Sequence, residues 1–226
     1  MRSPLFLATL LTLAAAGCSP AAPPTEPIPL LETDSLGKWK EIEAFASYGE
    51  VSVTDGVLEI GMGEPFTGVV WSDVDPYTLP LIDYEIAFQA RRVDGTDFFA
   101  ALTFPVGDLK TSCSLIVGGW GGGLVGISSI DGNDASENET ASYHRFEDNV
   151  WYKIRLQVQK DRFRAWIGDK IVINAITKGR KLSLRFGDIE HCAPLGFATY
   201  QTRGQIKDLT IRKLKPDEIV ATPEDY

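Results

Sequence analysis

An acidic, amide-rich loop follows a glycine-rich turn that carries a single tryptophan. Trp120 lies among five glycines between Gly118 and Gly123, with short apolar runs on both sides. Glycine at this density predicts a turn with positive φ, a bulge, or the close approach of a ligand. The loop that follows supplies carboxylates and amides at Asp131, Asn133, Asp134, Glu137, Asn138 and Glu139. An aromatic ring beside such groups is typical of a sugar-binding surface, although a tight hairpin before a solvated loop gives the same pattern. Both interpretations stay open.

Hydrolysis of a glycosidic bond requires two carboxyl groups, one on each side of the bond. We assign this pair of catalytic roles to Glu139 and Asp134. The residues that we expect to bind a carbohydrate ligand are Trp120, Asp131, Asn133, Glu137, Asn138 and His144. His144 follows the loop directly, so it is either a base near the loop or an ordinary exposed histidine.

The same loop resembles a calcium loop faintly, because oxygen ligands alternate from Asp131. It lacks the glycine at the sixth position and the glutamate at the twelfth, which excludes a regular calcium-binding hand. An irregular Ca²⁺ site near Asp131 and Asp134 stays open, and otherwise we expect no metal and no cofactor. The segment Gly121–Gly126 matches the glycine spacing of dinucleotide-binding loops, but the residues after it continue as a strand rather than a helix.

Composition excludes some partners. The chain has 226 residues, a net charge of −9 and 44% hydrophobic residues, which is enough for one substantial core. No basic cluster is present that would neutralise phosphates, so we expect no nucleic-acid partner. The sequence does not determine the oligomeric state.

The N-terminus reads as a secretory signal. Residues 1–17 combine Arg2 with a short apolar run and small residues before Cys18. The Ala16-Gly17-Cys18 sequence resembles a bacterial lipobox, which predicts lipidation of Cys18, and the alternative is an ordinary signal peptide. Residues 18–35 are rich in proline and predict an extended tether. We therefore expect a protein of the cell envelope, lipid-anchored at the outer membrane or on the periplasmic face.

Two cysteines remain for an oxidising compartment, Cys113 and Cys192. They form either one disulfide or two buried thiols, and the sequence leaves both open.

From Leu36 to Leu214 the hydrophobic pattern has period two. Residues 150–160 alternate cleanly, Asp55-Gly56 predicts a hairpin turn, and the last strand changes phase between Ile206 and Leu209, which predicts a bulge. In residues 97–106 we expect one face to carry Phe98, Ala100, Leu102 and Phe104. We expect Trp39, Tyr152 and Phe163 in the core. No window has a helical period, so the chain predicts one all-β, two-layer antiparallel sandwich over residues 36–214, with a flexible C-terminal tail at 215–226.

Three segments carry a family resemblance. The strand Asn149–Leu156 and its continuation Arg164–Lys170 resemble the core of concanavalin A-like lectin and glucanase jelly rolls. The ending Pro194–Gln201 with Ile206–Arg212 resembles the last strands of the same folds. With the lipobox, the whole domain resembles the 3-keto-disaccharide hydrolase family of bacterial, planctomycete-type lipoproteins.

This resemblance implies a jelly-roll sandwich and a hydrolase of 3-keto-glycosides. The arginine, glutamate and glutamine of the family's usual strands are absent from residues 98–104 and 113–119, so no catalytic residue is carried over. Three functions stay open: a carbohydrate-active enzyme, a non-catalytic glycan-binding surface module, and a structural lipoprotein.

Overall fold

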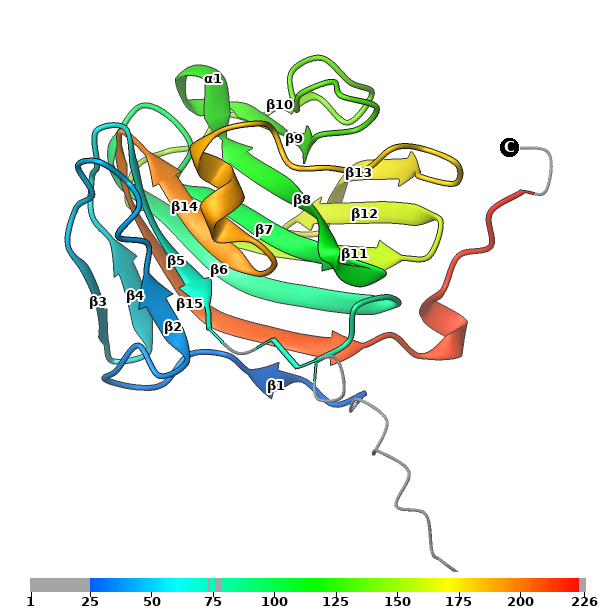
Figure 1. Cartoon of the computed structure of the whole chain (residues 1–226), viewed down its shortest axis with the longest axis horizontal. Helices are drawn as coiled ribbons and strands as arrows, with labels where there is room; N and C mark the ends of the chain where they lie inside the picture. Colours follow the sequence, from blue (N-terminus) through cyan, green and yellow to red (C-terminus); the bar gives the residue numbers. More distant parts are fainter. Residues whose placement is uncertain (1–24, 73, 76–78, 224–226) are drawn as a thin grey trace, which may run out of the picture.

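The computed structural model describes residues 25–72, 74–75 and 79–223. They form a two-layer antiparallel sandwich, as the period-two pattern predicts (Figure 1). Sheet A has the order β13 (Lys170–Ile176), β12 (Arg162–Ile167), β11 (Tyr152–Gln159), β6 (Tyr84–Gly95), β15 (Thr202–Lys213), β4 (Val57–Ile60) and β3 (Val51–Thr54), and β1 (Ile28–Pro29) pairs with β15. Sheet B has the order β10 (Ser142–Tyr143), β9 (Leu124–Ser128), β8 (Asp108–Gly118), β7 (Ala100–Val106), β14 (Gly196–Tyr200), β5 (Phe66–Trp71) and β2 (Trp39–Glu41).

Local sequence signals explain several elements. Strands β3 and β4 pair across the turn at Asp55-Gly56, where both residues have positive φ. The register of β15 against β6 shifts between Lys207 and Thr210, so the predicted bulge is confirmed. Helical structure is limited to the short turn α1 (Gly119–Gly122) and the 3₁₀ helices η1 (Asp188–Cys192) and η2 (Pro216–Glu218) in the described part of the chain. None of these described helices has the length and apolar character needed to cross a membrane.

The main core fills the space between the sheets. Trp39 and Phe163 are buried in it and Tyr152 packs against it, as predicted. Two buried aromatic side chains have hydrogen-bonded polar atoms: the Tyr84 hydroxyl donates to the Pro105 carbonyl at 2.6 Å, and the Trp39 Nε1–H donates to the Leu30 carbonyl at 2.7 Å. These bonds let large aromatic side chains be buried without the cost of an unpaired donor.

A second apolar cluster covers the outer face of sheet B. It includes Phe98, Ile116 and Ala198, and η1 contributes Ile189 to it. The prediction that Phe98 shares a face with Ala100 and Leu102 is therefore wrong, because Phe98 belongs to this outer cluster whereas the other two lie in the main core. Phe98 precedes the regular part of β7, and Phe99 takes the inward position there. Sheet B is thus apolar on both faces.

The sandwich extends beyond the boundaries expected from the sequence. Strand β1 pairs with β15, and Leu30 of the expected tether is buried. At the other end, the expected tail from Lys215 begins with η2, and the Val220 N–H donates to Gln159 Oε1 at 2.9 Å. The signal peptide, Cys18 and the first part of the tether lie outside the described residues.

Cys113 and Cys192 are free and buried, one in each apolar cluster. Burial raises the pKa of each thiol to about 12, since the charged thiolate is poorly solvated there. Of the two alternatives, the structure has the buried thiols.

Glu218 fastens η2 to sheet A. Its two carboxylate oxygens accept from Arg212 Nη1 and Nη2, each at 2.7 Å, and Oε2 also accepts from the Lys215 N–H. The bond to Arg212 lowers the pKa of Glu218 to about 2. Because the folded pKa lies below the unfolded value, this contribution to stability is complete above about pH 4.5 and is lost as the pH falls towards 2.

We expect Glu218→Gln to speed hydrogen exchange at the Val220 amide about 5- to 10-fold at pH 7, which corresponds to an ion pair of about 1 kcal/mol at a partly exposed site. Exchange followed by NMR measures this. Asp217→Asn, at the exposed neighbouring position, is the matched control and should leave the Val220 rate unchanged. An equal rate in the Glu218 variant and the native protein would contradict the role of this ion pair.

Candidate functional site

A cavity of about 400 Å³ opens on the outer face of sheet B, beside the η1 segment. Figure 1 shows η1 as the orange coil over β14, with α1 at the end of β8. The cavity is lined by Phe66, Asp97, Phe98, Ser114, Ile116, Trp120, Ser128, Asp134, Arg185, Phe186, Asp188, Ile189 and Tyr200. These residues come from strands of sheet B, the segment before β7, the α1 turn, the acidic loop, the segment before η1 and η1 itself.

Aromatic side chains gather on one side of the cavity. The rings of Phe66 and Tyr200 meet edge to face with centroids 5.1 Å apart, and Phe98 lies 5.6 Å from Tyr200. Phe66 is on β5 and Tyr200 on β14, which are hydrogen-bonded neighbours at this pair. The rigid sheet therefore fixes an apolar surface inside the cavity.

The α1 turn presents Trp120 to the cavity. Gly118, Trp120 and Gly121 all have positive φ, so the β8–β9 hairpin requires glycine on each side of the tryptophan. The Asp97 carboxylate accepts from the Gly121 N–H at 3.2 Å and from the Phe98 N–H at 2.8 Å, which links the turn to the start of β7. The Trp120 side chain stays 43% exposed while it lines the cavity. Its ring is thus available for stacking.

Both carboxylate oxygens of Asp134 have partners. Its Oδ1 accepts from the Ser128 hydroxyl and from the Ala135 N–H, and its Oδ2 pairs with Arg185 at 2.7 Å. Its side chain is only 14% exposed. The acidic loop is held close to β9 because Gly126 has no side chain, and a Cβ there would lie 2.6 Å from the Ala135 carbonyl oxygen. The carboxylate of Asp134 is therefore fixed in place as an acceptor.

The segment before η1 and the first residues of η1 complete the cavity with groups of mixed character. Arg185 supplies a cation, Asp188 a further carboxylate, and Phe186 a ring that is 92% exposed. Three carboxylates, one guanidinium and several rings thus surround a single cavity. Such a set can accept and donate hydrogen bonds to hydroxyl groups while an apolar face stacks on an aromatic ring.

Of the predicted site residues, the structure brings only Trp120 and Asp134 to the cavity. Glu139 and Asp131 lie on the same loop but both bind Arg180, with Glu139 Oε1 at 2.6 Å from Nη1. The Arg180 guanidinium lowers the pKa of both carboxyl groups and keeps them ionised. Glu139 does not line the cavity, so it is not placed opposite Asp134 across a ligand there.

Asn138 holds the loop together. Its amide donates to the carbonyls of Ile127 and Asp134, each at 2.8 Å, and its carbonyl accepts from the Thr140 N–H. Asn133 and Glu137 are exposed and take part through backbone hydrogen bonds. None of the three lines the cavity.

His144 is half-buried beside Phe146 and does not line the cavity. Burial, with a smaller effect of Lys170, lowers its pKa. In the part of the chain that the structure describes, no group of three His, Cys, Asp or Glu side chains could hold a metal ion. The carboxylate of Asp131, the first residue of the calcium-like loop, binds Arg180 and the Lys181 N–H.

Sequence reasoning missed most of the cavity. The residues that it did not single out include Asp97, Arg185, Phe186, Asp188 and Tyr200. One signal was available: strands such as β14 and β8 are apolar at both odd and even positions, which indicates burial on both faces. That pattern predicts a covered outer face on sheet B, although it does not say which loop covers it.

Comparisons with known proteins show a shared fold. No protein-family model matches this sequence, and no match was found among the curated proteins. Among solved structures, the carbohydrate-binding module CBM66 from Bacillus subtilis aligns with a TM-score of 0.52 at 15% identity, covering 78% of this chain and 96% of that one. The Emp46p carbohydrate recognition domain aligns with a TM-score of 0.54 at 12% identity, covering 86% and 99%. A structure described with the endo-acting O-glycanases by which human gut bacteria initiate mucin breakdown aligns with a TM-score of 0.50 at 12% identity, covering 82% and 95%.

Proposed function

We propose that this chain is a lipid-anchored protein of the cell envelope that binds a glycan in the cavity on sheet B. The observation that carries the proposal is the position of Trp120, whose exposed ring borders a cavity that also holds Asp97, Asp134 and Asp188. A pyranose ring has an apolar face of C–H groups and a polar edge of hydroxyls. Trp120 offers a stacking surface for the first, and the carboxylates with Arg185 offer acceptors and donors for the second.

Rigid support favours binding of a specific ligand. The Trp120 turn is tied to Asp97, and the Asp134 carboxylate is tied to Ser128, Ala135 and Arg185. A binding group that is already ordered loses little conformational entropy when a ligand arrives. The neighbours CBM66 and the Emp46p domain bear names that refer to carbohydrate binding, which supports the proposal by analogy of fold. The lipid anchor rests on the sequence around Cys18.

A second candidate is hydrolysis of a 3-keto-glycoside, which the family resemblance implies. A ketone at C3 acidifies the proton on C2, so one carboxylate could remove that proton while another acid protonates the leaving oxygen. The C1–O bond then breaks as a C1=C2 double bond forms, and addition of water across this double bond completes the hydrolysis. The observation in its favour is that Asp97, Asp134 and Asp188 line one cavity. Asp134 with Asp188 then replaces the expected pair of Asp134 with Glu139.

We expect Trp120→Ala to weaken glycan binding at least 10-fold, because the ring supplies the stacking surface. A panel of neutral and 3-keto oligosaccharides, followed by calorimetry, measures this. Tyr143→Ala is the matched control: this ring is 72% exposed on the neighbouring strand β10 and does not line the cavity. Equal losses in the two variants, or no binding to any member of the panel, would refute binding at this cavity.

The same panel separates binding from catalysis when product release is followed. Turnover of 3-keto-glycosides that is lost in Asp134→Asn and kept in Glu139→Gln supports the enzyme with Asp134 in the active site. Binding without turnover supports the glycan-binding protein alone. Turnover lost only in Glu139→Gln would contradict the assignment of the site to this cavity.

A further inference from the structure

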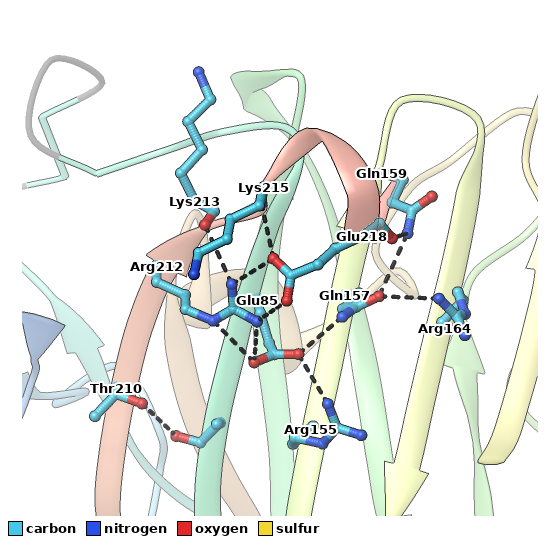
Figure 2. Close-up of polar contacts among 11 residues, drawn as sticks. Glu85, Arg155, Gln157, Gln159, Arg164, Thr210, Arg212, Lys213, Lys215 and Glu218 are labelled. Atoms are coloured by element: carbon cyan, nitrogen blue, oxygen red, sulfur yellow. Dashed lines mark hydrogen bonds and ion pairs between the residues drawn. The ribbon is translucent and has the colours of Figure 1, made fainter. Parts of the chain in front are cut away.

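The outer face of sheet A carries three neighbouring arginines. Arg162 and Arg164 point outward from β12, alternating with the core residues Phe163 and Ala165, and Arg155 lies on the paired strand β11. Figure 2 shows Arg155 and Arg164 on adjacent strands beside Gln157. Residues two apart on a strand are separated by about 6.5–7 Å, and adjacent strands by about 5 Å. We call Arg155, Arg162 and Arg164 the arginine patch.

Among the described residues, Glu85 is the carboxylate that pairs with a member of the arginine patch, and it has other partners. Glu85 accepts from Arg212 Nε at 3.2 Å and Nη2 at 3.0 Å and from Gln157 Nε2 at 2.9 Å, so Arg155, at 3.2 Å, shares it (Figure 2). In the described part of the chain, the Arg164 guanidinium donates a hydrogen bond only to Gln157 Oε1, at 3.4 Å. Among the described residues, no carboxylate forms an ion pair with Arg162 or Arg164.

Arg162 is the most enclosed member of the patch. It is only 8% exposed, and its Nη1 donates to Asn174 Oδ1 at 2.8 Å. Its Nε–H has no hydrogen-bond partner among the described residues. A buried guanidinium with an unsatisfied donor costs free energy, which a bound acceptor would recover. Burial and the like charges of Arg162 and Arg155 also lower the pKa of Arg164.

Trp166 holds two of the guanidinium groups in position. The Arg155 Cζ lies 4.5 Å and the Arg164 Cζ 4.6 Å from its ring centroid. Stacking on one ring orders both side chains, so their N–H groups are arranged before a ligand binds. The patch therefore combines local positive charge, an unsatisfied buried donor and ordered side chains.

We propose that the arginine patch binds oxyanion groups of an acidic polysaccharide, as carboxylates or sulfate esters along its chain. Arginine matches planar or tetrahedral oxyanions through several N–H donors at once. A sparsely charged polymer fits better than a nucleic acid, because the protein as a whole carries a charge of −9. The side chains beside the cations are mostly polar (Gln157, Gln159 and Asn174), with Trp166 and Ile171 as apolar neighbours, and phosphatidylglycerol vesicles test a lipid surface directly. This site lies on the opposite sheet from the cavity and is independent of the proposed function.

The test uses chondroitin sulfate, with dextran as the neutral polymer. We expect the protein to bind chondroitin sulfate at 50 mM NaCl and to bind it at least 10-fold more weakly at 300 mM NaCl. We expect no binding of dextran. Arg162→Gln with Arg164→Gln should weaken binding at least 10-fold. Arg203→Gln is the matched control, because Arg203 lies on the same face and is paired with Glu59, and it should change binding less than twofold.

Three results would overturn the proposal: no binding of chondroitin sulfate at 50 mM NaCl, equal affinity in the double variant, or binding to phosphatidylglycerol vesicles with none to chondroitin sulfate. If the double variant is unfolded by circular dichroism, Arg164→Gln alone, at the less buried position, provides the comparison and should weaken binding at least threefold. Trp120→Ala should leave chondroitin sulfate binding unchanged, and its loss there would place this ligand in the cavity instead.

Discussion

Replacing Glu85 with alanine is expected to destabilise the protein by about 2–3 kcal/mol, because it removes a buried carboxylate that accepts charge-assisted hydrogen bonds from two arginines. The Glu85 side chain is 7% exposed and binds Arg212, Arg155 and Gln157 from the strands on either side of β6. Without it, Arg155 loses its carboxylate and Gln157 loses an acceptor, while Arg212 keeps its ion pair with Glu218. Denaturant unfolding followed by tryptophan fluorescence measures the change in the free energy of unfolding.

Glu59→Ala is the matched control for Glu85. Glu59 also pairs with an arginine, Arg203, at 2.7 Å on the outer face of sheet A, but the two side chains are 27% and 46% exposed. Solvent screens this pair, so its loss should cost at most about 1 kcal/mol. If both variants lose the same stability, burial of the Glu85 network is not what makes it important.

Asn138→Ala is expected to cost about 2–3 kcal/mol and to weaken glycan binding through the loop. The amide of Asn138 joins β9 to the loop at Ile127 and Asp134, and its oxygen binds Thr140. Removal takes away the side-chain hydrogen bonds to the Ile127 carbonyl and the Thr140 N–H, and the Asp134 carbonyl keeps only its bond from the Glu137 N–H, so the segment that positions Asp134 is less firmly held. Thermal unfolding and the glycan titration described above measure the two effects.

Asn133→Ala distinguishes the roles of the two asparagines. Asn133 lies on the same loop with an exposed side chain, while its backbone pairs with Ile130. This variant should stay within about 0.5 kcal/mol of the native protein. A larger effect at Asn133 than at Asn138 would show that direct contact with a ligand, rather than support of the loop, explains the amides.

The fold could be predicted from the sequence because period-two burial is a local signal. Strand β11 alternates buried Ile154, Leu156 and Val158 with residues of the outer face. The Asp55-Gly56 turn likewise fixes the β3–β4 hairpin within a few residues. The boundaries were harder to predict. Strand β1 is formed by proline-flanked residues whose partner, β15, lies at the other end of the chain, so composition alone suggested a tether. Likewise, η2 is held by Glu218 to Arg212, a pairing that local pattern does not reveal.

The candidate site could be predicted only in part. Trp120 is marked by the glycines that its turn requires, and Asp134 by its place in an acidic loop. Arg185, Asp188 and Tyr200 reach the same cavity from segments more than fifty residues away along the chain, through the pairing of β14 in sheet B and the packing of η1. Glu139 and Asp131 look equivalent to Asp134 in the sequence. Arg180, more than forty residues later, withdraws them from the cavity.

Sheet B packs against one apolar cluster on each face, and the two clusters differ in how easily local unfolding exposes them. The outer cluster is smaller and is covered by η1 and the acidic loop, whereas the main core lies between two hydrogen-bonded sheets. The outer cover can therefore open locally while the sandwich stays folded, since the free energy of local opening is smaller there. Cys192 is the last residue of η1 and Cys113 lies within the main core, so each cluster contains one thiol. Local opening of η1 would thus expose the Cys192 thiol to solvent while the Cys113 thiol stays covered.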